Sequence, residues 1–154
     1  GISIGSFYQY FDDKDDLYLY LLSDIEKKIF NKQKERTGFY LTNTIKVPVE
    51  EICTQKEIDF NRTWYKVPIE VMMKFYFGKY CKELNESLYE ELVELKSKNK
   101  LVDNVDVNFA FHMYTTTMFN ILMYFRENNI TDEEEKNRIK NNFYTNWFLK
   151  SIIK

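Results

Sequence analysis

The sequence predicts an all-α protein, and three features of its 154 residues lead to that prediction. Glycine and proline are scarce, with four and two residues, so few residues interrupt helices. Apolar residues recur at helical spacing in several long stretches. Helix-capping residues precede some of these stretches. The composition, 44% hydrophobic and 18% aromatic, suffices for one substantial core, or for one domain with a small appendage.

The N-terminal seventeen residues predict a short helix, a tight break and the start of a long helix. Ser3 is a good N-cap for a helix from Ile4 to about Tyr10. Asp13 can then cap a second helix, with Asp16 three residues later. We expect this second helix to run from Asp13 to about Arg36, because it carries an apolar stripe: Leu17, Leu21, Leu22, Ile25 and Ile29.

A less regular stretch follows this long helix. Residues 38–47 are β-branched and aromatic, and they fit a loop, the foot of the next helix or a short extended segment. Pro48 suits the first turn of a helix, which we expect over residues 48–65.

Two further helices are predicted in the middle of the chain. Pro68 begins a helix over residues 69–80 that is hydrophobic nearly all round, so we expect it to be central, with Gly78 near its end. Another helix begins at Asn85 or Glu86 and ends in the polar run 96–100.

The C-terminal third predicts two long helices that are rich in apolar residues. The first spans about Val105 to Asn128. The second begins at a capping box, Thr131-Asp132-Glu133-Glu134, and runs to about Ile153. Together they carry more apolar surface than a single small body needs.

Several functional classes lack their sequence signatures. Cys53 and Cys81 are isolated and there is one histidine, so we expect neither a metal site nor a disulfide. Reduced cysteines fit the cytoplasm. No nucleophile–base pair or phosphate-binding loop is visible, so no enzyme, catalytic residue or cofactor is predicted. No apolar run approaches the roughly 20 residues that a membrane span needs.

The N-terminal stretch resembles the second half of the helix-turn-helix of TetR-family (tetracycline-repressor-like) regulators. The family pattern is roughly Gly-[Val/Ile]-Ser-x-Gly-x-[aromatic/aliphatic]-Tyr-x-[Tyr/His]-Phe-x-x-Lys-[Glu/Asp]-x-Leu. Eleven positions match in this frame of seventeen: Gly1, Ile2, Ser3, Gly5, Phe7, Tyr8, Tyr10, Phe11, Lys14, Asp15 and Leu17. The resemblance implies that the rest of the motif would lie upstream of Gly1. Helix number and order resemble the family over most of the chain.

The resemblance implies that the helix from Ile4 enters the major groove of DNA. Gln9 can make a bidentate hydrogen bond to adenine, Ser6 can hydrogen-bond to several different bases, and Ile4 can contact a thymine methyl group. Gly5 lets the helix approach the groove closely. The remaining predicted DNA contacts are to phosphate: Ser3, Tyr8, Tyr10 and Lys14.

Two observations complicate this interpretation. Tyr8 and Tyr10 alternatively belong to the small core under the helix, where Phe7, Phe11 and Leu17 are expected. The formal net charge of −2 is unusual for a DNA-binding protein. The resemblance accounts for that charge, because the basic N-terminal arm of the family would lie upstream of Gly1.

The resemblance also divides the chain by function. Residues 1–30 would be the C-terminal part of the DNA-binding domain with the start of a linking helix, and residues 31–154 the ligand-binding and dimerisation domain. Residues able to line an apolar effector site are Phe60, Trp64, Met72, Met73, Tyr76, Phe77, Tyr89, His112, Tyr114 and Thr116. The alternative is that these side chains form the core, and that Thr115 to Thr117 return hydrogen bonds to the helix backbone.

In the family the last two helices pair with those of a second subunit as a four-helix bundle. The residues that this resemblance places in a homodimer interface are Phe111, Met118, Phe119, Leu122, Phe143 and Trp147. The leading hypothesis is a ligand-responsive transcriptional regulator, and a repressor is favoured over an activator. It would bind a palindromic operator as a dimer and be released from it by a small apolar or aromatic effector. The alternative is a helical dimeric sensor or interaction protein without sequence-specific DNA binding.

Overall fold

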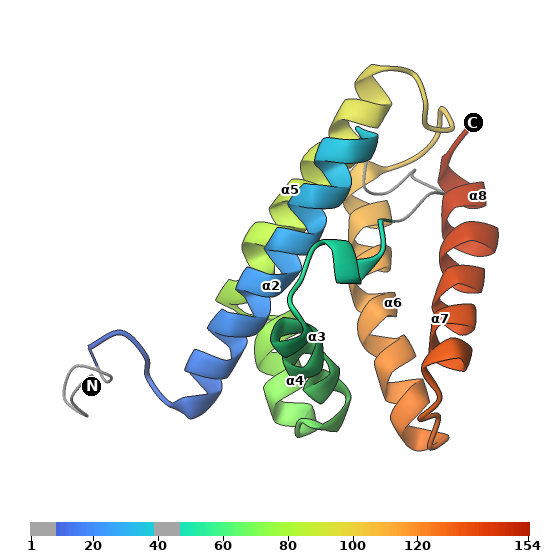
Figure 1. Ribbon diagram of the computed structural model, residues 1–154. Coiled ribbons are helices and arrows are strands. Elements are labelled where there is room, and N and C mark those ends of the chain that lie inside the picture. The colour runs from blue at the N-terminus through green and yellow to red at the C-terminus, as the bar shows by residue number, and fades with distance from the viewer. Residues whose placement is uncertain (1–8, 39–46) are drawn as a thin grey trace. The chain divides into compact units, whose positions relative to one another are not determined.

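The computed structural model describes residues 9–38 and 47–154, and those residues are predominantly helical (Figure 1). The all-α prediction is therefore confirmed. The α-helices are α2 (Lys14–Thr37), α3 (Gln55–Arg62), α4 (Ile69–Tyr76), α5 (Lys79–Ser97), α6 (Val107–Glu127), α7 (Glu133–Asn142) and α8 (Lys150–Ile152). Short 3₁₀ turns cover Val49–Glu51 and Thr63–Lys66, and a π-helical segment, Phe143–Leu149, joins α7 to α8.

The described residues form two compact units. The first contains residues 9–36 and 47–84, and the second contains residues 37–38 and 85–154, so α5 contributes its first turns to one unit and the remainder to the other. The boundary predicted at residue 30 separates DNA binding from ligand binding and dimerisation. Compact packing does not test that separation, so it stays a prediction.

Helix α2 begins as the sequence predicts. The backbone N–H of Asp16 donates to Asp13 Oδ1 at 2.8 Å, which is the capping contact expected for Asp13. The predicted apolar stripe is only partly correct, because Leu21 is exposed whereas Leu19 and Phe30 are buried. Two polar residues are also buried on α2, Ser23 and Gln33.

Hydrogen bonds explain why α2 buries polar residues. The Ser23 hydroxyl donates to the Tyr80 carbonyl oxygen at 3.0 Å. The Gln33 side-chain amide both donates to and accepts from the Val47 backbone at 3.0 Å. Because these groups are satisfied, their burial costs little, and the buried face differs from the one that apolar periodicity alone indicates.

The single helix predicted over residues 48–65 is wrong. A 3₁₀ turn, Val49–Glu51, is followed by a break, and α3 begins only after Thr54. The reason is a local capping box: the backbone N–H of Thr54 donates to Glu57 Oε2 at 2.7 Å, and Glu57 N–H donates back to the Thr54 hydroxyl. This cap starts a new helix inside the predicted one.

Helix α4 is shorter and less enclosed than predicted. Its buried residues are Val71, Met72 and Phe75. Ile69 and Met73, on the same helix, are exposed. The expectation of burial nearly all round is therefore wrong, because only one face of α4 is covered. The helix ends at Tyr76, and α5 begins at Lys79, earlier than the predicted Asn85 or Glu86.

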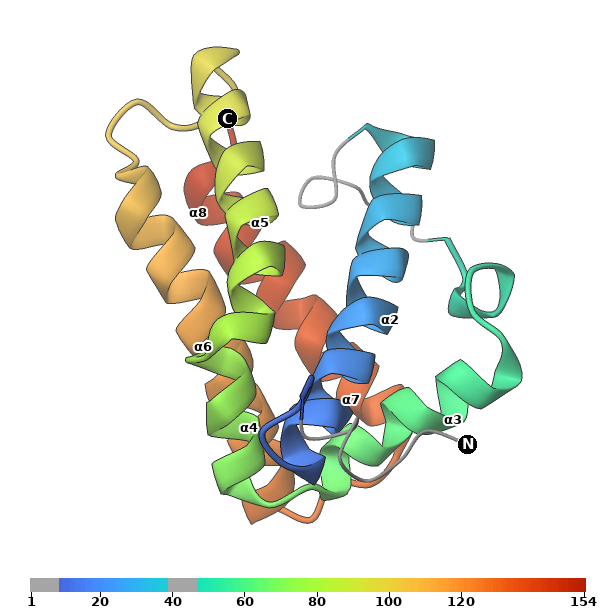
Figure 2. The ribbon, with the colours of Figure 1, turned by 90° about the vertical axis from the view of Figure 1, so that its left-hand side faces the viewer.

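In the second unit, α5 lies beside α6, and α6 beside the C-terminal helices (Figure 2). Asp106 caps α6 by accepting a hydrogen bond from Phe109 N–H at 3.0 Å. Asp132 caps α7 by accepting from Glu135 N–H at 2.7 Å, so the cap is Asp132 and not the predicted Thr131. The buried side chains of this unit are Leu88, Leu92, Leu95, Leu101, Val107, Ala110, Leu122, Phe125, Phe148 and Ile152.

None of the helices in the described ranges combines the length and apolar character that crossing a membrane requires.

Candidate functional site

The predicted DNA-binding residues fall at the N-terminal edge of the described chain. Ser3, Ile4, Gly5, Ser6 and Tyr8 lie outside the described residues.

The other three positions are described and exposed. Gln9 and Tyr10 lie in a turn before α2, and the Tyr10 side chain is 76% exposed. Lys14 is the first residue of α2 and is also exposed. Exposed side chains at these positions are able to make surface contacts. The exposure of Tyr10 disagrees with the alternative that its ring belongs to the small core under the predicted helix.

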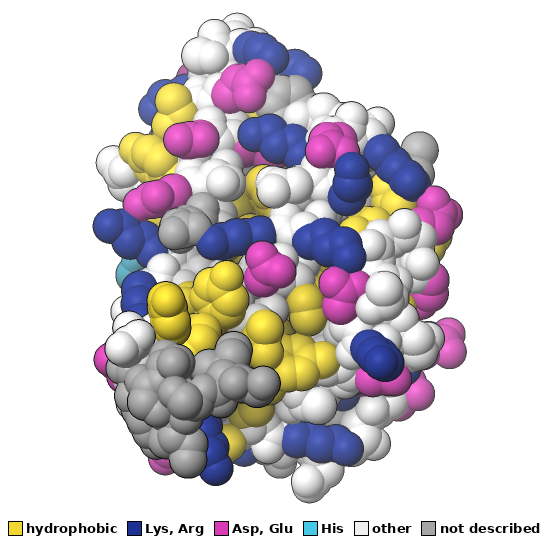
Figure 3. All heavy atoms as spheres, turned by 60° about the vertical axis from the view of Figure 1, so that its left-hand side comes forward, with side chains coloured by type: hydrophobic (Ala, Val, Ile, Leu, Met, Phe, Trp, Pro, Cys, Tyr) yellow, Lys and Arg dark blue, Asp and Glu magenta, His cyan; other side chains and the backbone are white. Residues whose placement is uncertain are grey.

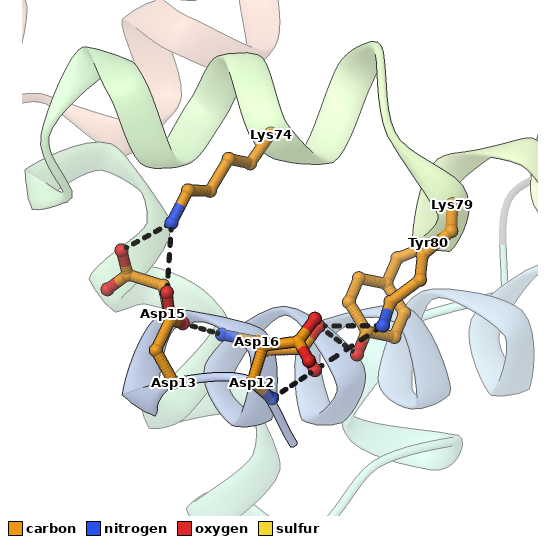
Figure 4. Close-up of polar contacts among 7 residues, drawn as sticks. All are labelled: Asp12, Asp13, Asp15, Asp16, Lys74, Lys79 and Tyr80. Carbon is orange, nitrogen blue, oxygen red and sulfur yellow. Dashed lines mark hydrogen bonds and ion pairs between the residues drawn. The ribbon is translucent and has the colours of Figure 1, made fainter. Parts of the chain in front are cut away.

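A group of charged residues follows directly after these positions, and we call it the acid–lysine cluster (Figure 4). Lys74, near the end of α4, places its ammonium 3.1 Å from Asp15 Oδ2 and 3.3 Å from Asp13 Oδ2. The cluster consists of Asp12, Asp13, Asp15 and Asp16 at the start of α2, with Lys74, Lys79 and Tyr80.

The second half of the cluster lies at the start of α5. The Lys79 ammonium is 3.0 Å from Asp16 Oδ1. The Tyr80 hydroxyl donates to the same oxygen at 2.5 Å, and the backbone N–H of Asp12 donates to Asp16 Oδ2 at 3.1 Å. Asp16 is therefore held from three directions, and its side chain is only 11% exposed.

The contacts shift the acid–base equilibria of the cluster. Burial alone would raise the pKa of Asp16, but hydrogen bonds from Tyr80 and Lys79 outweigh it and leave that pKa below its usual value. The hydrogen bond from Asp16 N–H lowers the pKa of Asp13. Hydrogen bonds to Asp15 and Asp13 raise the pKa of Lys74. Asp13, Asp16 and Lys74 therefore remain charged near neutral pH.

A cleft of about 420 Å³ adjoins the cluster. Two of the residues predicted to bind an effector, Met73 and Phe77, line it together with Leu19 and the charged side chains. Its walls thus combine apolar and charged side chains, whereas the sequence predicts an apolar effector site with few polar groups. Within the described ranges, no group of three or more His, Cys, Asp or Glu residues is suited to hold a metal ion.

Four other predicted effector-binding residues pack into the first unit. Trp64 and Met72 are buried. The Trp64 ring lies 6.1 Å from the ring of Tyr76, and Phe60 lies 5.0 Å from Tyr18. Burial raises the pKa of Tyr76 well above its usual value, so its phenol is neutral. These contacts are those of a packed aromatic core.

The remaining four predicted effector-binding residues belong to the second unit. Tyr89 packs against Phe111 with ring centroids 5.5 Å apart, and Tyr114 packs against Phe148 at 5.3 Å. The side chain of His112 is exposed.

The threonines of α6 bond to their own helix. The Thr115 hydroxyl donates to the Phe111 carbonyl oxygen at 3.2 Å, and the Thr116 hydroxyl donates to the His112 carbonyl oxygen at 2.8 Å. For these two residues, the alternative of hydrogen bonding to the helix backbone is confirmed.

An open apolar groove of about 700 Å³ runs between α6 and the C-terminal helices, and we call it the α6–C-terminal groove. Phe109, Met113 and Trp147 line it and are 64%, 43% and 69% exposed. Of the residues predicted for a dimer interface, Phe143 and Trp147 line this groove. Leu122 is buried within its own unit, and the others are half-buried: Phe111, Met118 and Phe119.

Sequence reasoning missed two groove residues, Phe109 and Met113. They are four residues apart on α6, and Thr117 follows at the same spacing in the groove wall. This spacing puts them on one face of a helix, which was the available signal. Apolar periodicity does not distinguish a face that packs within the chain from one that stays open.

Charge is distributed without a single basic area on the face drawn in Figure 3, where acidic and basic side chains of the described residues are interspersed. Comparison with known proteins adds no relative, since no family model, curated protein or solved structure matches the chain.

Proposed function

We propose that this chain acts in a ligand-responsive transcriptional regulator of the TetR type that binds a palindromic operator as a homodimer. The observation that carries the proposal is the resemblance of residues 1–17, with eleven matching positions in one fixed frame. Three described features support it: Gln9, Tyr10 and Lys14 are exposed, Asp13 caps α2 as expected, and α2 is a long helix of 24 residues.

In this proposal the unliganded dimer occupies its operator and represses transcription. A small apolar or aromatic effector binds the helical body and releases the DNA. By linkage the effector must bind more tightly to the state that does not bind DNA, because a ligand with equal affinity for both states shifts nothing. The exposed apolar side chains of the α6–C-terminal groove supply a surface for the second subunit. We expect a cytoplasmic protein, in keeping with its buried free cysteines, Cys53 and Cys81.

A second candidate function is a dimeric sensor that does not bind specific DNA. The net charge of −2 and the interspersed charges of Figure 3 favour it. The two candidates share a dimerising body, so an experiment on the DNA-binding residues separates them.

The test compares substitutions at the described DNA-binding positions. Lys14→Ala removes a predicted phosphate contact, so affinity should fall alike for every DNA sequence and the salt slope should decrease by about one. Gln9→Ala removes a predicted base contact, so preference should relax at one base position, by about 1–3 kcal/mol. Fluorescence anisotropy with an operator and its single-base variants, at several salt concentrations, measures both effects.

Lys66→Ala is the matched control, because Lys66 is an exposed lysine on the 3₁₀ turn Thr63–Lys66, away from the predicted contacts. If Lys14→Ala and Lys66→Ala weaken binding equally, the assignment of Lys14 is wrong. If the unsubstituted protein binds all DNA equally weakly, the second candidate function is favoured.

A further inference from the structure

Helices α4 and α5 meet at a bend that only glycine fits. The two residues between them are Phe77 and Gly78. A Cβ atom on Gly78 would lie 2.0 Å from the Lys74 carbonyl oxygen, a backbone atom, so any other residue requires the backbone to move. The bend separates Lys74, on α4, from Lys79, the first residue of α5.

The two lysines on either side of this bend reach the same turn of α2 (Figure 4). Lys74 binds Asp13 and Asp15, and Lys79 binds Asp16. Each arm of the bend therefore holds a different set of carboxylates. The Tyr80 hydroxyl strengthens the α5 arm through its hydrogen bond to Asp16.

Aromatic contacts extend the α5 arm along α2. The Tyr80 ring lies 6.3 Å from the ring of Tyr20, in an edge-to-face arrangement. The Tyr20 ring lies 5.5 Å from that of Phe11, also edge to face. This series connects α5 to Phe11, which precedes α2 and immediately follows the predicted DNA contacts Gln9 and Tyr10.

The geometry makes these contacts sensitive to the angle of the bend. The three aspartates lie within about one turn of α2 and at its cap, so their mutual spacing is fixed by that turn. The two lysines, in contrast, belong to separate helices. A change in the angle between α4 and α5 therefore moves the two ammonium groups relative to each other, and it alters how strongly each arm holds the first turn of α2.

We propose that the α4–α5 bend is a two-armed clamp on the first turn of α2, and that opening of the bend releases this turn. The existence of the clamp is independent of DNA. Its regulatory role rests on the proposed function: an effector that changes the bend would loosen the segment next to the predicted DNA contacts.

Amide hydrogen exchange of residues 16–20 tests the clamp directly. Exposed ion pairs contribute modestly, so Lys74→Ala and Lys79→Ala should each speed exchange about two- to fivefold, and together by more. Tyr80→Phe should act in the same direction, because it removes only the hydroxyl that binds Asp16. Lys66→Ala is the control and should leave these amides unchanged, and exchange in α6 serves as an internal reference. Equal exchange in the Lys74, Lys79 and Lys66 variants would overturn the clamp.

A DNA measurement tests the regulatory role separately. The Lys74→Ala/Lys79→Ala variant should bind operator at least about threefold more weakly than Lys56→Ala/Lys66→Ala, which removes the same charge from exposed lysines. Faster exchange with no specific DNA binding by the unsubstituted protein would support the clamp and refute the proposed function. Unchanged exchange with normal operator binding would refute the clamp and support the proposed function.

Discussion

Glu57 shows how one carboxylate can join two helices and a cap. The Lys28 ammonium, on α2, lies 2.9 Å and 3.0 Å from its two oxygens. The Thr54 backbone N–H donates to the same carboxylate at 2.7 Å. The Lys28 hydrogen bonds are the main cause that lowers the pKa of Glu57 to about 2, and those from Thr54 come next.

This depressed pKa predicts a defined pH dependence of stability. Glu57 titrates near 4.5 in the unfolded chain and near 2 in the folded one, so its contribution is fully present above about pH 4.5. It is lost as the pH falls from 4.5 toward 2. Glu57→Gln should therefore lower the free energy of unfolding at pH 7, and its difference from the unsubstituted protein should shrink across that window.

Urea unfolding at pH 7, 4.5, 3 and 2.5 measures this difference. Glu50→Gln, at an exposed position of the preceding 3₁₀ turn, is the control and should show little effect at any pH. A difference for Glu57→Gln that stays constant with pH would show that its carboxylate is not held as described.

Among single residues, those that cap helices were the most predictable from the sequence. Asp13 precedes a clear apolar repeat, and its side chain caps α2 as expected. Thr54 and Glu57 have the same type of spacing, but Pro48 upstream suggested a helix that continued through them. The competition between two N-terminal signals was settled by the reciprocal hydrogen bonds of the capping box, which sequence spacing alone does not rank.

At the scale of elements, the α4–α5 bend depends on one glycine. Gly78→Ala forces a Cβ atom against the Lys74 carbonyl oxygen, 2.0 Å away in the present backbone. Overpacking of this kind costs about 1–3 kcal/mol, which outweighs the gain of about 0.4–1 kcal/mol from the lower conformational freedom of the unfolded chain. We therefore expect Gly78→Ala to lower the free energy of unfolding, measured by chemical denaturation.

The control for this substitution is Glu90→Ala, at an exposed position of α5. Surface changes of this type usually stay within about 0.5 kcal/mol. If Gly78→Ala is instead neutral or stabilising, the bend adapts to a side chain, and the close approach of Lys74 is not a constraint.

Long amphipathic helices were predicted well, and short ones poorly. Helix α6 matches its predicted range of 105–128 closely, because Asp106 caps it and a long apolar repeat follows. Helix α4 was predicted to be central because most of its residues are apolar, but Met73 on α4 and Phe77 directly after it are exposed beside the acid–lysine cluster. Composition indicates how apolar a helix is, and only the tertiary structure shows which of its faces are covered.

At the scale of the whole molecule, the proposal requires a dimer. Trp147 is the most exposed aromatic of the α6–C-terminal groove, at 69%, and it lies within the predicted interface. Trp147→Glu places a charge where a partner would bury an aromatic side chain, so the dimer dissociation constant should rise at least about tenfold. Sedimentation equilibrium over a range of protein concentrations measures this change.

The matched control is Tyr124→Glu, which introduces the same charge at an exposed aromatic of α6 that does not line the groove. It should leave the dissociation constant nearly unchanged. A dimer that tolerates Trp147→Glu, or is weakened equally by both changes, would place the interface elsewhere.

The candidate site was less predictable than the fold, for a physical reason. The acid–lysine cluster joins residues 13–16 to residues 74–80, and such long-range pairs leave no local pattern in the sequence. Asp15 and Asp16 lie in the first turn of α2, where a negative charge favours the helix dipole, but their lysine partners are known only from the positions of α4 and α5 in the structure. Residues 1–8, which carry most of the predicted DNA contacts, lie outside the described ranges.

Selection of genomic fragments is the most direct test of sequence-specific DNA binding by a dimer. The protein, expressed from its complete gene, would be used to select fragments at moderate salt, followed by footprinting. We expect a palindromic site whose half-sites are separated by about one helical turn, about 34–36 Å, or a multiple of it. A folded dimer that protects no specific sequence under these conditions would contradict this expectation.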